Sequence, residues 1–282
     1  MKNPEIITRI KFNSLKKYYD KTWDEKNHTL HVGYFRNGAK TLQRAYKDAT
    51  LNLIEKINKV SKIKENSIVL DIGCGTGRTL MDVCKKYGCG GVGIDLSDEM
   101  IKDAKQHLNQ LNRIAGKKIN IKFIRASGSD LKKIFKQKES FTHIISQDAL
   151  FLVNDKKSLY EGIRELLAKD GAFAIDDFLS EQNKETLKES DKKLIYKLVN
   201  WSEGLSFKMY KEVLKSNNLE VTYSENMKKD MIITYELLAK KMKRYLNSKD
   251  RNYQNLYERY LAIVKKVNNN EMGWGIFIGI KR

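Results

Sequence analysis

Apolar residues follow two different periods along the chain. Between residues 42 and 60 they recur every three or four positions, which predicts an amphipathic helix. The segment SIVLDI, residues 67–72, is a short continuous apolar run, which is typical of a buried strand. Downstream the two patterns alternate: we expect helices over about 79–87, 99–114, 131–135 and 156–167, and strands over 91–95, 119–124, 142–147 and 171–176.

Strands that alternate with helices indicate an α/β fold. The connections between such strands are right-handed crossovers, so the pattern predicts a parallel sheet with helices on both faces. In sheets of this kind ligands bind beyond the carboxyl ends of the strands. Functional residues are therefore sought in the segments that follow each predicted strand.

The chain has 282 residues, enough for one large or two small domains with a real core. No apolar run approaches a membrane span, and the first residues lack the apolar centre of a signal peptide, so we expect a cytoplasmic protein. Cys74, Cys84 and Cys89 have neither metal-ligand spacing nor an even number. We therefore expect no metal site and no disulfide framework.

The chain is strongly basic. It has 54 Lys and Arg residues against 35 Asp and Glu residues, a net charge of +19. Such an excess can attract nucleic acid, an anionic membrane surface or an anionic substrate. Because the lysines are spread over the whole chain on polar helix faces, a solvated basic surface without a specific nucleic-acid partner is the preferred interpretation.

Three alternate glycines, Gly73, Gly75 and Gly77, follow the strand over 67–72. A dinucleotide fingerprint would need a further glycine where Arg78 stands, and Asp71 at the strand end would repel a pyrophosphate. No lysine followed by Ser or Thr completes a P-loop. The loop therefore suits a ligand with a nucleoside, no phosphate and a positive charge.

The next strand supplies a second indication. It ends at Asp95, where a carboxylate can accept hydrogen bonds from both hydroxyls of a ribose. Met100, one helical turn later, can lie against an adenine as a polarizable apolar wall. S-adenosylmethionine combines an adenosine, a sulfonium and an ammonium without phosphate, and it is the predicted cofactor.

The segment VLDIGCGTGR together with Asp95 resembles the first two motifs of the class I S-adenosylmethionine-dependent methyltransferases. Four further segments, SQDALF, RELLAKDGAFAIDDF, YYDKTWDEKNHTLHVGYF and MGWGIFIGIKR, are similar to the sarcosine and dimethylglycine N-methyltransferases and their relatives. The resemblance implies a Rossmann-like sheet of seven strands in the order 3-2-1-4-5-7-6, with the last strand antiparallel and helices on both faces. It also implies a helical lid over residues 1–40, a cofactor-binding core over 41–178 and 270–282, and a substrate-covering insertion with C-terminal helices over 179–269.

Site residues are carried over position by position from this resemblance. Glycines 73 and 75 with Cys74 are expected around the methionine tail, Gly128 and Ser129 at the adenine edge, and Gln147 and Asp148 beside the sulfonium. The full expected cofactor-binding set is Tyr18, Tyr19, Asp71, Gly73, Cys74, Gly75, Asp95, Leu96, Met100, Gly128, Ser129 and Gln147. The expected catalytic residues are Tyr19, His31 and Asp148.

The acceptor is expected to be a small molecule, most favourably the nitrogen of a small amine or amino acid. An amine that gains charge during transfer would be stabilised by ring faces. The predicted substrate cage consists of Trp23, Tyr34, Trp201, Tyr210 and Tyr235. Relatives often have a histidine where Leu152 stands, which keeps carbon or oxygen methylation of a prenyl or quinone acceptor as an alternative.

Two other classes of function compete with a small-molecule methyltransferase. A nucleic-acid-modifying methyltransferase is favoured by the basic charge, but the chain has no base-flipping signature and no appended RNA-binding module. The second competing class is a module that binds the cofactor without catalysing methyl transfer. The intact glycine motif and aromatic lid favour the enzyme.

Overall fold

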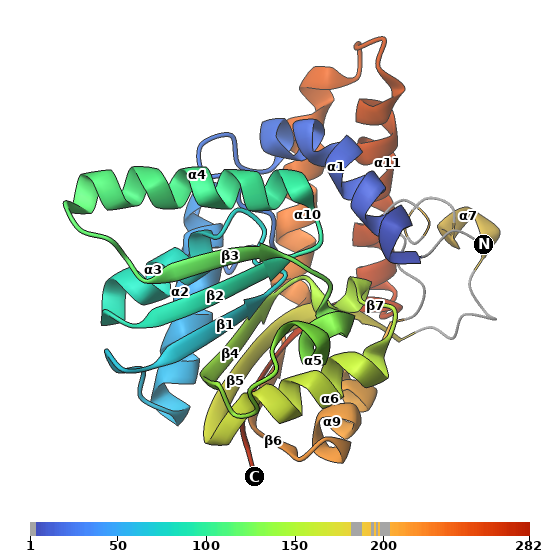
Figure 1. The fold of residues 1–282 in the computed structure, drawn as a ribbon. Helices are drawn as coiled ribbons and strands as arrows, with labels where there is room; N and C mark the ends of the chain where they lie inside the picture. Colours follow the sequence, from blue (N-terminus) through green and yellow to red (C-terminus); the bar gives the residue numbers. More distant parts are fainter. Residues whose placement is uncertain (1–3, 182–187, 193–194, 196, 198–203) are drawn as a thin grey trace.

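The computed structural model describes residues 4–181, 188–192, 195, 197 and 204–282 (Figure 1). Within these residues a seven-stranded sheet has the order β3-β2-β1-β4-β5-β7-β6. β7 runs antiparallel to both of its neighbours, and the other described pairs are parallel. The strands are β1 (Ile68–Ile72), β2 (Gly90–Asp95), β3 (Ile121–Arg125), β4 (Phe141–Gln147), β5 (Leu167–Ser180), β6 (Leu219–Asn226) and β7 (Met272–Lys281). The predicted fold class and strand order are confirmed.

Helices cover both faces of the sheet (Figure 1). One face packs against α2 (Leu42–Val60), α3 (Arg78–Tyr87), α4 (Asp98–Ala115), α10 (Lys228–Met242) and α11 (Arg251–Asn268). The other face packs against α5 (Leu131–Ile134), α6 (Lys156–Leu166) and α9 (Phe207–Ser216). Short elements complete the description: α7 (Glu189–Asp191), η1 (Gly128–Asp130), η2 (Leu150–Leu152) and η4 (Lys243–Tyr245). None of the described helices combines the length and apolarity that crossing a bilayer requires.

The closing strand β7 shows why the two faces carry different residues. Side chains alternate between the faces of a strand, and the even-numbered residues from Met272 to Ile278 pack with α2, α10 and α11. Glycines occupy several positions of the opposite face. A Cβ at Gly279 would lie 1.9 Å from the carbonyl oxygen of Glu220 and 2.6 Å from Cζ of Phe173. Gly279 therefore allows β6 to lie close against β7.

The N-terminal helix α1 (Pro4–Thr22) lies over the carboxyl ends of the strands, beside α4, α10 and α11 (Figure 1). It is tied to α4 and the loop before it by side chains. The Lys16 ammonium lies 2.6 Å from Asp103, and the Ser97 hydroxyl donates to Asn13 at 2.6 Å. A helix in this position closes the edge of the sheet where ligands are expected.

The predicted division of the chain needs one correction. Residues 179–269 were expected to form an insertion and helices outside the core, yet β6 lies within this range and forms an edge of the sheet. The reason is backbone pairing, because β6 bonds along β7 from Leu219 to Asn226. α9 from the same range packs on the sheet as well. The remaining division into lid, core and insertion stays a prediction.

Candidate active site

A cavity of about 490 Å³ lies at the carboxyl ends of β1, β2, β3 and β4. Residues of α1, α2 and the loop between them form its other walls. Of the predicted cofactor-binding residues the wall contains Asp71, Gly73, Cys74, Gly75, Asp95, Leu96, Met100, Gly128 and Gln147. The predicted catalytic residues His31 and Asp148 line it too. Residues from four strand ends thus meet at one place.

The turn after β1 requires glycine for two different reasons. Gly73 has φ of 77°, and a Cβ there would lie 2.1 Å from Cβ of Ala149. Gly75 has φ of 51°, and a Cβ there would meet nothing within 4 Å. The first glycine allows close packing, whereas the second leaves backbone open beside the cavity.

Asp95 at the end of β2 fixes this turn. Its Oδ2 accepts a hydrogen bond from the backbone N–H of Gly75 at 2.9 Å, and its Oδ1 accepts one from Ser97 at 2.8 Å. Burial raises the pKa of the carboxyl, and the backbone donors lower it. A carboxylate oxygen can accept more than one hydrogen bond, so Asp95 keeps capacity for a ligand in the cavity.

Asp71 is a buried carboxylate with an oxygen that lacks a partner. The residue is 2% exposed, and among the described residues Oδ2 has no hydrogen-bond donor. Burial raises the pKa of Asp71 to about 8, and the negative charge of Asp95 adds to this. An unpaired carboxylate oxygen in a cavity wall fits a cationic ligand group, because such a group would restore the lost solvation.

Gln147 at the end of β4 belongs to a buried polar network. Thr79 donates to its Oε1 at 2.7 Å, and its Nε2 donates to Oδ2 of Asp176 at 3.0 Å. Burial raises the pKa of Asp176 to about 8, while the bond from Gln147 lowers it. The network holds the Gln147 amide in one orientation at the cavity wall.

Asp148 directly follows Gln147 and links the end of β4 to two segments that are distant in the sequence. Its Oδ2 accepts from the backbone N–H of Val32 at 2.6 Å, and its Oδ1 accepts from Nε1 of Trp274 at 2.7 Å. Burial and the charge of Asp176 raise its pKa well above the usual value, and the bond from Val32 lowers it. Its φ of 48° is an unusual backbone conformation for a residue other than glycine. The carboxyl therefore holds the loop after α1 in place.

His31 is buried and neutral. Its Nδ1 lies 3.0 Å from the carbonyl oxygen of Val32, an acceptor, so Nδ1 carries the proton. The Thr50 hydroxyl lies 3.2 Å from Nε2 and also donates to Oε1 of Gln147 at 3.3 Å, so its one hydrogen is shared between these two acceptors. Burial lowers the pKa of His31 to about 4. The ring is thus an oriented, uncharged group in the cavity wall at neutral pH.

Some predicted cofactor residues lie elsewhere. The Tyr18 hydroxyl donates to Asp250 at 2.6 Å, and the Tyr19 hydroxyl accepts from Arg259 at 3.2 Å, so both rings face α11. Neither lines the cavity. The side of α1 that faces the cavity carries Glu5, Thr8, Arg9 and Phe12. Ser129 contacts Glu5, but its neighbours Ser127 and Gly128 form the wall.

The predicted aromatic cage also needs correction. Trp23 and Tyr235 pack edge to face at 5.8 Å in the core under α10 and α11, and Tyr34 lies below Arg36. Tyr210 stacks on Phe277 on the opposite face of the sheet. None of these four aromatic residues lines the cavity, and Trp201 lies outside the described residues. The reason is packing: large rings gain most by burial in the core.

Tyr46 is an aromatic residue of the cavity wall that the sequence pattern predicts only as part of a helix. Tyr46 of α2 is 1% exposed, and its hydroxyl has no partner among the described residues. Its ring stacks on Trp23 at 6.1 Å and meets His31 edge to face at 5.7 Å. Helical periodicity placed Tyr46 on the buried face, but the periodicity could not say that this face borders a cavity.

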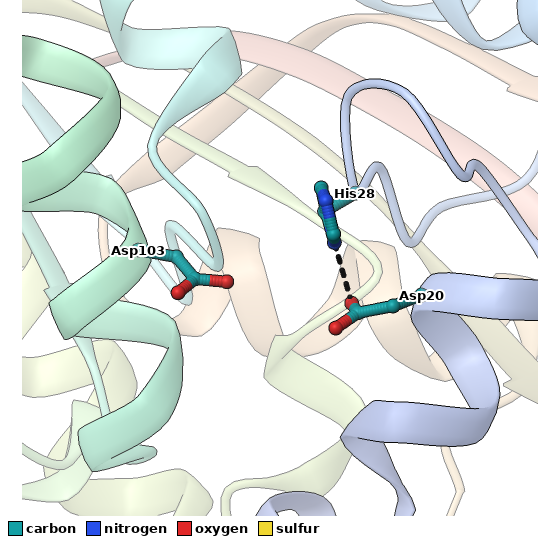
Figure 2. A group of neighbouring side chains, drawn as sticks. All are labelled: Asp20, His28 and Asp103. Carbon is teal, nitrogen blue, oxygen red and sulfur yellow. Dashed lines mark ion pairs between the residues drawn. The ribbon is translucent and has the colours of Figure 1, made fainter. Parts of the chain in front are cut away.

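Asp20, His28 and Asp103 have the spacing of a metal site (Figure 2). In Figure 2, His28 and Asp20 point toward one another, at 2.9 Å between Nδ1 and Oδ1. The Lys16 ammonium lies 2.6 Å from both Asp20 and Asp103. The Lys16 ammonium already supplies the positive charge between the two carboxylates. These side chains therefore form an ion-pair network that links α1 and α4.

The sequence profile described as "Methyltransferase domain" matches residues 63–258, which is more than half of the chain. The chain belongs to this methyltransferase family. This membership confirms the methyltransferase family that the glycine motif and Asp95 predict.

Individual relatives of the methyltransferase are distant. It is 26% identical to phosphoethanolamine N-methyltransferase 1 of Zea mays, with 83% of this chain and 44% of the relative covered. It is 24% identical to a sterol 24-C-methyltransferase of Debaryomyces hansenii, with 83% and 59% covered. It is 26% identical to phosphoethanolamine N-methyltransferase of Plasmodium falciparum, with 93% and 96% covered. The chain therefore spans about half the length of the maize and yeast relatives.

Solved structures share the fold. A protein described as a sarcosine dimethylglycine methyltransferase from Galdieria sulphuraria has a TM-score of 0.82 at 17% identity, covering 95% of this chain and 98% of that one. A cyclopropane synthase from Mycobacterium tuberculosis has a TM-score of 0.85 at 14% identity, with 98% of each chain covered. At these identities the likeness concerns the fold.

Proposed function

We propose that this protein transfers a methyl group from S-adenosylmethionine to a small molecule, with the nitrogen of a small amine or amino acid as the preferred acceptor. The observation that carries the proposal is the pair of carboxylates at the ends of β1 and β2. The unpartnered oxygen of Asp71 and the remaining acceptor capacity of Asp95 lie in one cavity of about 490 Å³. A nucleoside that also bears a cationic group would give hydrogen bonds to Asp95 and an ion pair to Asp71.

The residues that would hold the cofactor follow from their chemistry. Asp95 would accept hydrogen bonds from the ribose hydroxyls, and Asp71 would pair with the ammonium of the methionine tail. The backbone around Cys74 would lie along that tail, since Gly75 leaves it open. Met100 and Gly128 would contact the adenine.

Catalysis in this site would depend on alignment and on exclusion of water. When bound, the cofactor supplies a methyl group on a cationic sulfur, which a neutral lone pair can displace. α1 covers the cavity and excludes water, and the carboxyl of Asp148 fixes the loop that carries His31. The Nε2 lone pair of His31 shares the single Thr50 hydroxyl hydrogen with Gln147, and we propose that the acceptor binds in its deprotonated form, so that transfer requires no base.

A second acceptor class has its own support. Four apolar residues follow Asp148 and line the cavity: Ala149, Leu150, Leu152 and Val153. This wall would suit a prenyl or quinone chain, methylated at carbon or oxygen. The yeast relative is named a C-methyltransferase and the two phosphoethanolamine relatives are named N-methyltransferases, so both acceptor classes occur among similar proteins.

Location and partners are part of the proposal. The three cysteines are free thiols, which fits the cytoplasm. We propose that the basic surface binds nucleic acid only without specificity, so binding to RNA and DNA should fade steeply as salt rises. Methyl incorporation into either polymer at physiological salt would overturn this part.

A methyl-transfer assay with labelled S-adenosylmethionine tests the proposal. Amines, amino acids, quinones, prenyl alcohols and RNA would be supplied in parallel, and the product mass would identify the atom and the number of methyl groups. Transfer to amines supports the first acceptor class, and transfer to lipid-like acceptors alone supports the second. Calorimetry that detects no binding of S-adenosylmethionine by the folded chain would refute the proposal.

A further inference from the structure

Two of the three cysteines form a pair at the end of α3. The Sγ atoms of Cys84 and Cys89 lie 3.8 Å apart, and the two residues are buried, at 1% and 2% exposed. Neither cysteine lines the cavity, whereas Cys74 is part of its wall. The pair therefore lies outside the site described above.

The way in which α3 ends holds the two thiols side by side. Gly88 follows the helix with φ of 71°, and its backbone N–H donates to the carbonyl oxygen of Cys84 at 2.9 Å. At helix ends of this kind the residue after the glycine commonly packs against the residue four positions before the glycine. Cys89 and Cys84 occupy these two positions, so the backbone of the helix end brings their sulfurs together.

Two thiols in this contact can react with each other, which two aliphatic side chains cannot do. A disulfide requires the sulfurs to approach from 3.8 Å to about 2.0 Å. The chain between them is the single turn at Gly88, so a small movement of this turn supplies the approach. A Cβ at Gly91 of β2 would lie 3.0 Å from Sγ of Cys84, so the glycine leaves room for that sulfur against the sheet.

A small oxidant can reach the pair from the surface. Lys85, Lys86 and Gly88 lie between the two cysteines in the sequence, and all three are exposed. Segments at the ends of helices open locally at a lower free energy than the whole domain unfolds. Opening of the last turn of α3 would expose both thiols together and leave the sheet intact.

We propose that Cys84 and Cys89 are a redox-sensitive modification site, at which a peroxide joins the two side chains in a reversible disulfide. One thiolate attacks the O–O bond, and a sulfenic acid and one water molecule form. The second thiol attacks the sulfenic sulfur, so that the S–S bond forms and a second water molecule leaves. The two sulfurs lose two electrons to the peroxide, and both thiol hydrogens end in water.

Cys89 is the thiol that reacts first. The hydrogen bond with Cys84 lowers the pKa of Cys89, although burial raises it. The thiolate is the form that attacks, so the thiol with the lower pKa starts the reaction. Cys84 is then the neighbouring sulfur that completes the bond.

The pair is remote from the proposed methyl-transfer site. β2 begins at Gly90, next to Cys89, and ends at Asp95 in the cavity wall, about 16 Å away along the strand. The disulfide would tie the end of α3 to the start of β2. In the cytoplasm proposed above such a bond is transient and responds to the level of oxidant, because thiols there are otherwise kept reduced.

Peptide mapping of the full, folded chain tests the pair. The protein is treated with hydrogen peroxide, its remaining thiols are alkylated during unfolding, and it is digested with trypsin without reduction. Trypsin cleaves after Lys85 and Lys86, so Cys84 and Cys89 fall in separate peptides that only a disulfide can join. We expect the linked peptides, an alkylated Cys74, and an intact chain that has lost two hydrogen atoms. Dithiothreitol should restore three alkylatable thiols.

Variants show which thiols are required. Cys84→Ser and Cys89→Ser should each lack the linked peptides. Cys74→Ser is the matched control, because it removes the third thiol, and it should form the disulfide as the wild type does.

Several results on the wild-type chain would overturn the proposal, whether or not the variants fold. Three alkylated cysteines after peroxide would leave the contact as simple packing. Addition of oxygen atoms without linked peptides, a crosslink between two chains, or a disulfide that forms only in the unfolded chain would also overturn it. The mapping needs neither cofactor nor acceptor, so its result is independent of the methyl-transfer assay.

Discussion

Trp274 donates from Nε1 to Oδ1 of Asp148 at 2.7 Å, although 126 positions separate the two residues. The other oxygen of the same carboxyl accepts from Val32 at 2.6 Å. The closing strand β7, the end of β4 and the loop after α1 are thereby joined by one side chain. This junction positions the cavity wall, because Val32 is the neighbour of His31.

Trp274→Phe tests this junction. The ring remains buried, but Asp148 loses one of its two donors in a dry environment, so the free energy of unfolding should fall by about 1 to 3 kcal/mol. Methyl transfer should fall more than the affinity for the cofactor, because the loop after α1 loses its anchor. Urea unfolding measures the loss of stability, and a methyl-transfer assay together with calorimetry of cofactor binding measures the second effect. A Trp274→Phe variant with wild-type stability and turnover would contradict the assignment.

Asp95→Ala should weaken binding of S-adenosylmethionine by about a hundredfold, since each hydrogen bond to a charged group contributes about 1.5 to 3 kcal/mol. Asp95→Asn should be intermediate, because its amide oxygen still accepts. Glu99→Ala, an exposed acidic residue four positions later, controls for the loss of charge. Unchanged affinity in folded Asp95→Ala would remove the ribose assignment.

The buried carboxyls predict how stability depends on pH. Burial raises the pKa of Asp71 and Asp176 to about 8 and that of Asp177 to about 7, from 3.8. As pH rises from about 4 to 8, the unfolded chain loses these protons first and the folded chain retains them. The ligand-free protein should therefore lose stability with rising pH, by at most about 1.4 kcal/mol per pH unit for each group.

Thermal unfolding between pH 5 and pH 9 measures this dependence. Asp71→Asn should make the decline shallower, because the amide does not titrate. Asp170→Asn, which changes an exposed residue, should leave the decline as it is in the wild type. A midpoint that rises over this range would show that the buried carboxyls are ionised in the folded chain.

Two glycines of one turn should respond differently to alanine. Both have positive φ, which costs a residue with a Cβ about 1 to 2 kcal/mol. Gly73→Ala adds a collision with Cβ of Ala149, whereas the added methyl at Gly75 meets nothing. Denaturant unfolding should show the larger loss for Gly73→Ala. Equal losses would mean that strain alone matters in this turn.

The sequence by itself determined the fold class and the cofactor half of the site. Apolar periodicity marks each strand and helix locally, and the order of elements then restricts the topology. Parallel strands place their carboxyl ends at one edge, so Asp71, Gly73 and Asp95 meet at the cavity for reasons that are local to each strand end. The glycine turn belongs to the same group, since its conformation depends on the residues of the turn itself.

Only the tertiary structure decided where the aromatic and charged side chains of distant segments meet. Trp23 and Tyr235 share a core with Tyr19, while Tyr210 lies across the sheet. Contacts between residues more than 200 positions apart, such as Tyr19 with Arg259, depend on how α1 packs against α11. No periodicity encodes that packing, because it follows from the volume and shape of all the side chains that share the core.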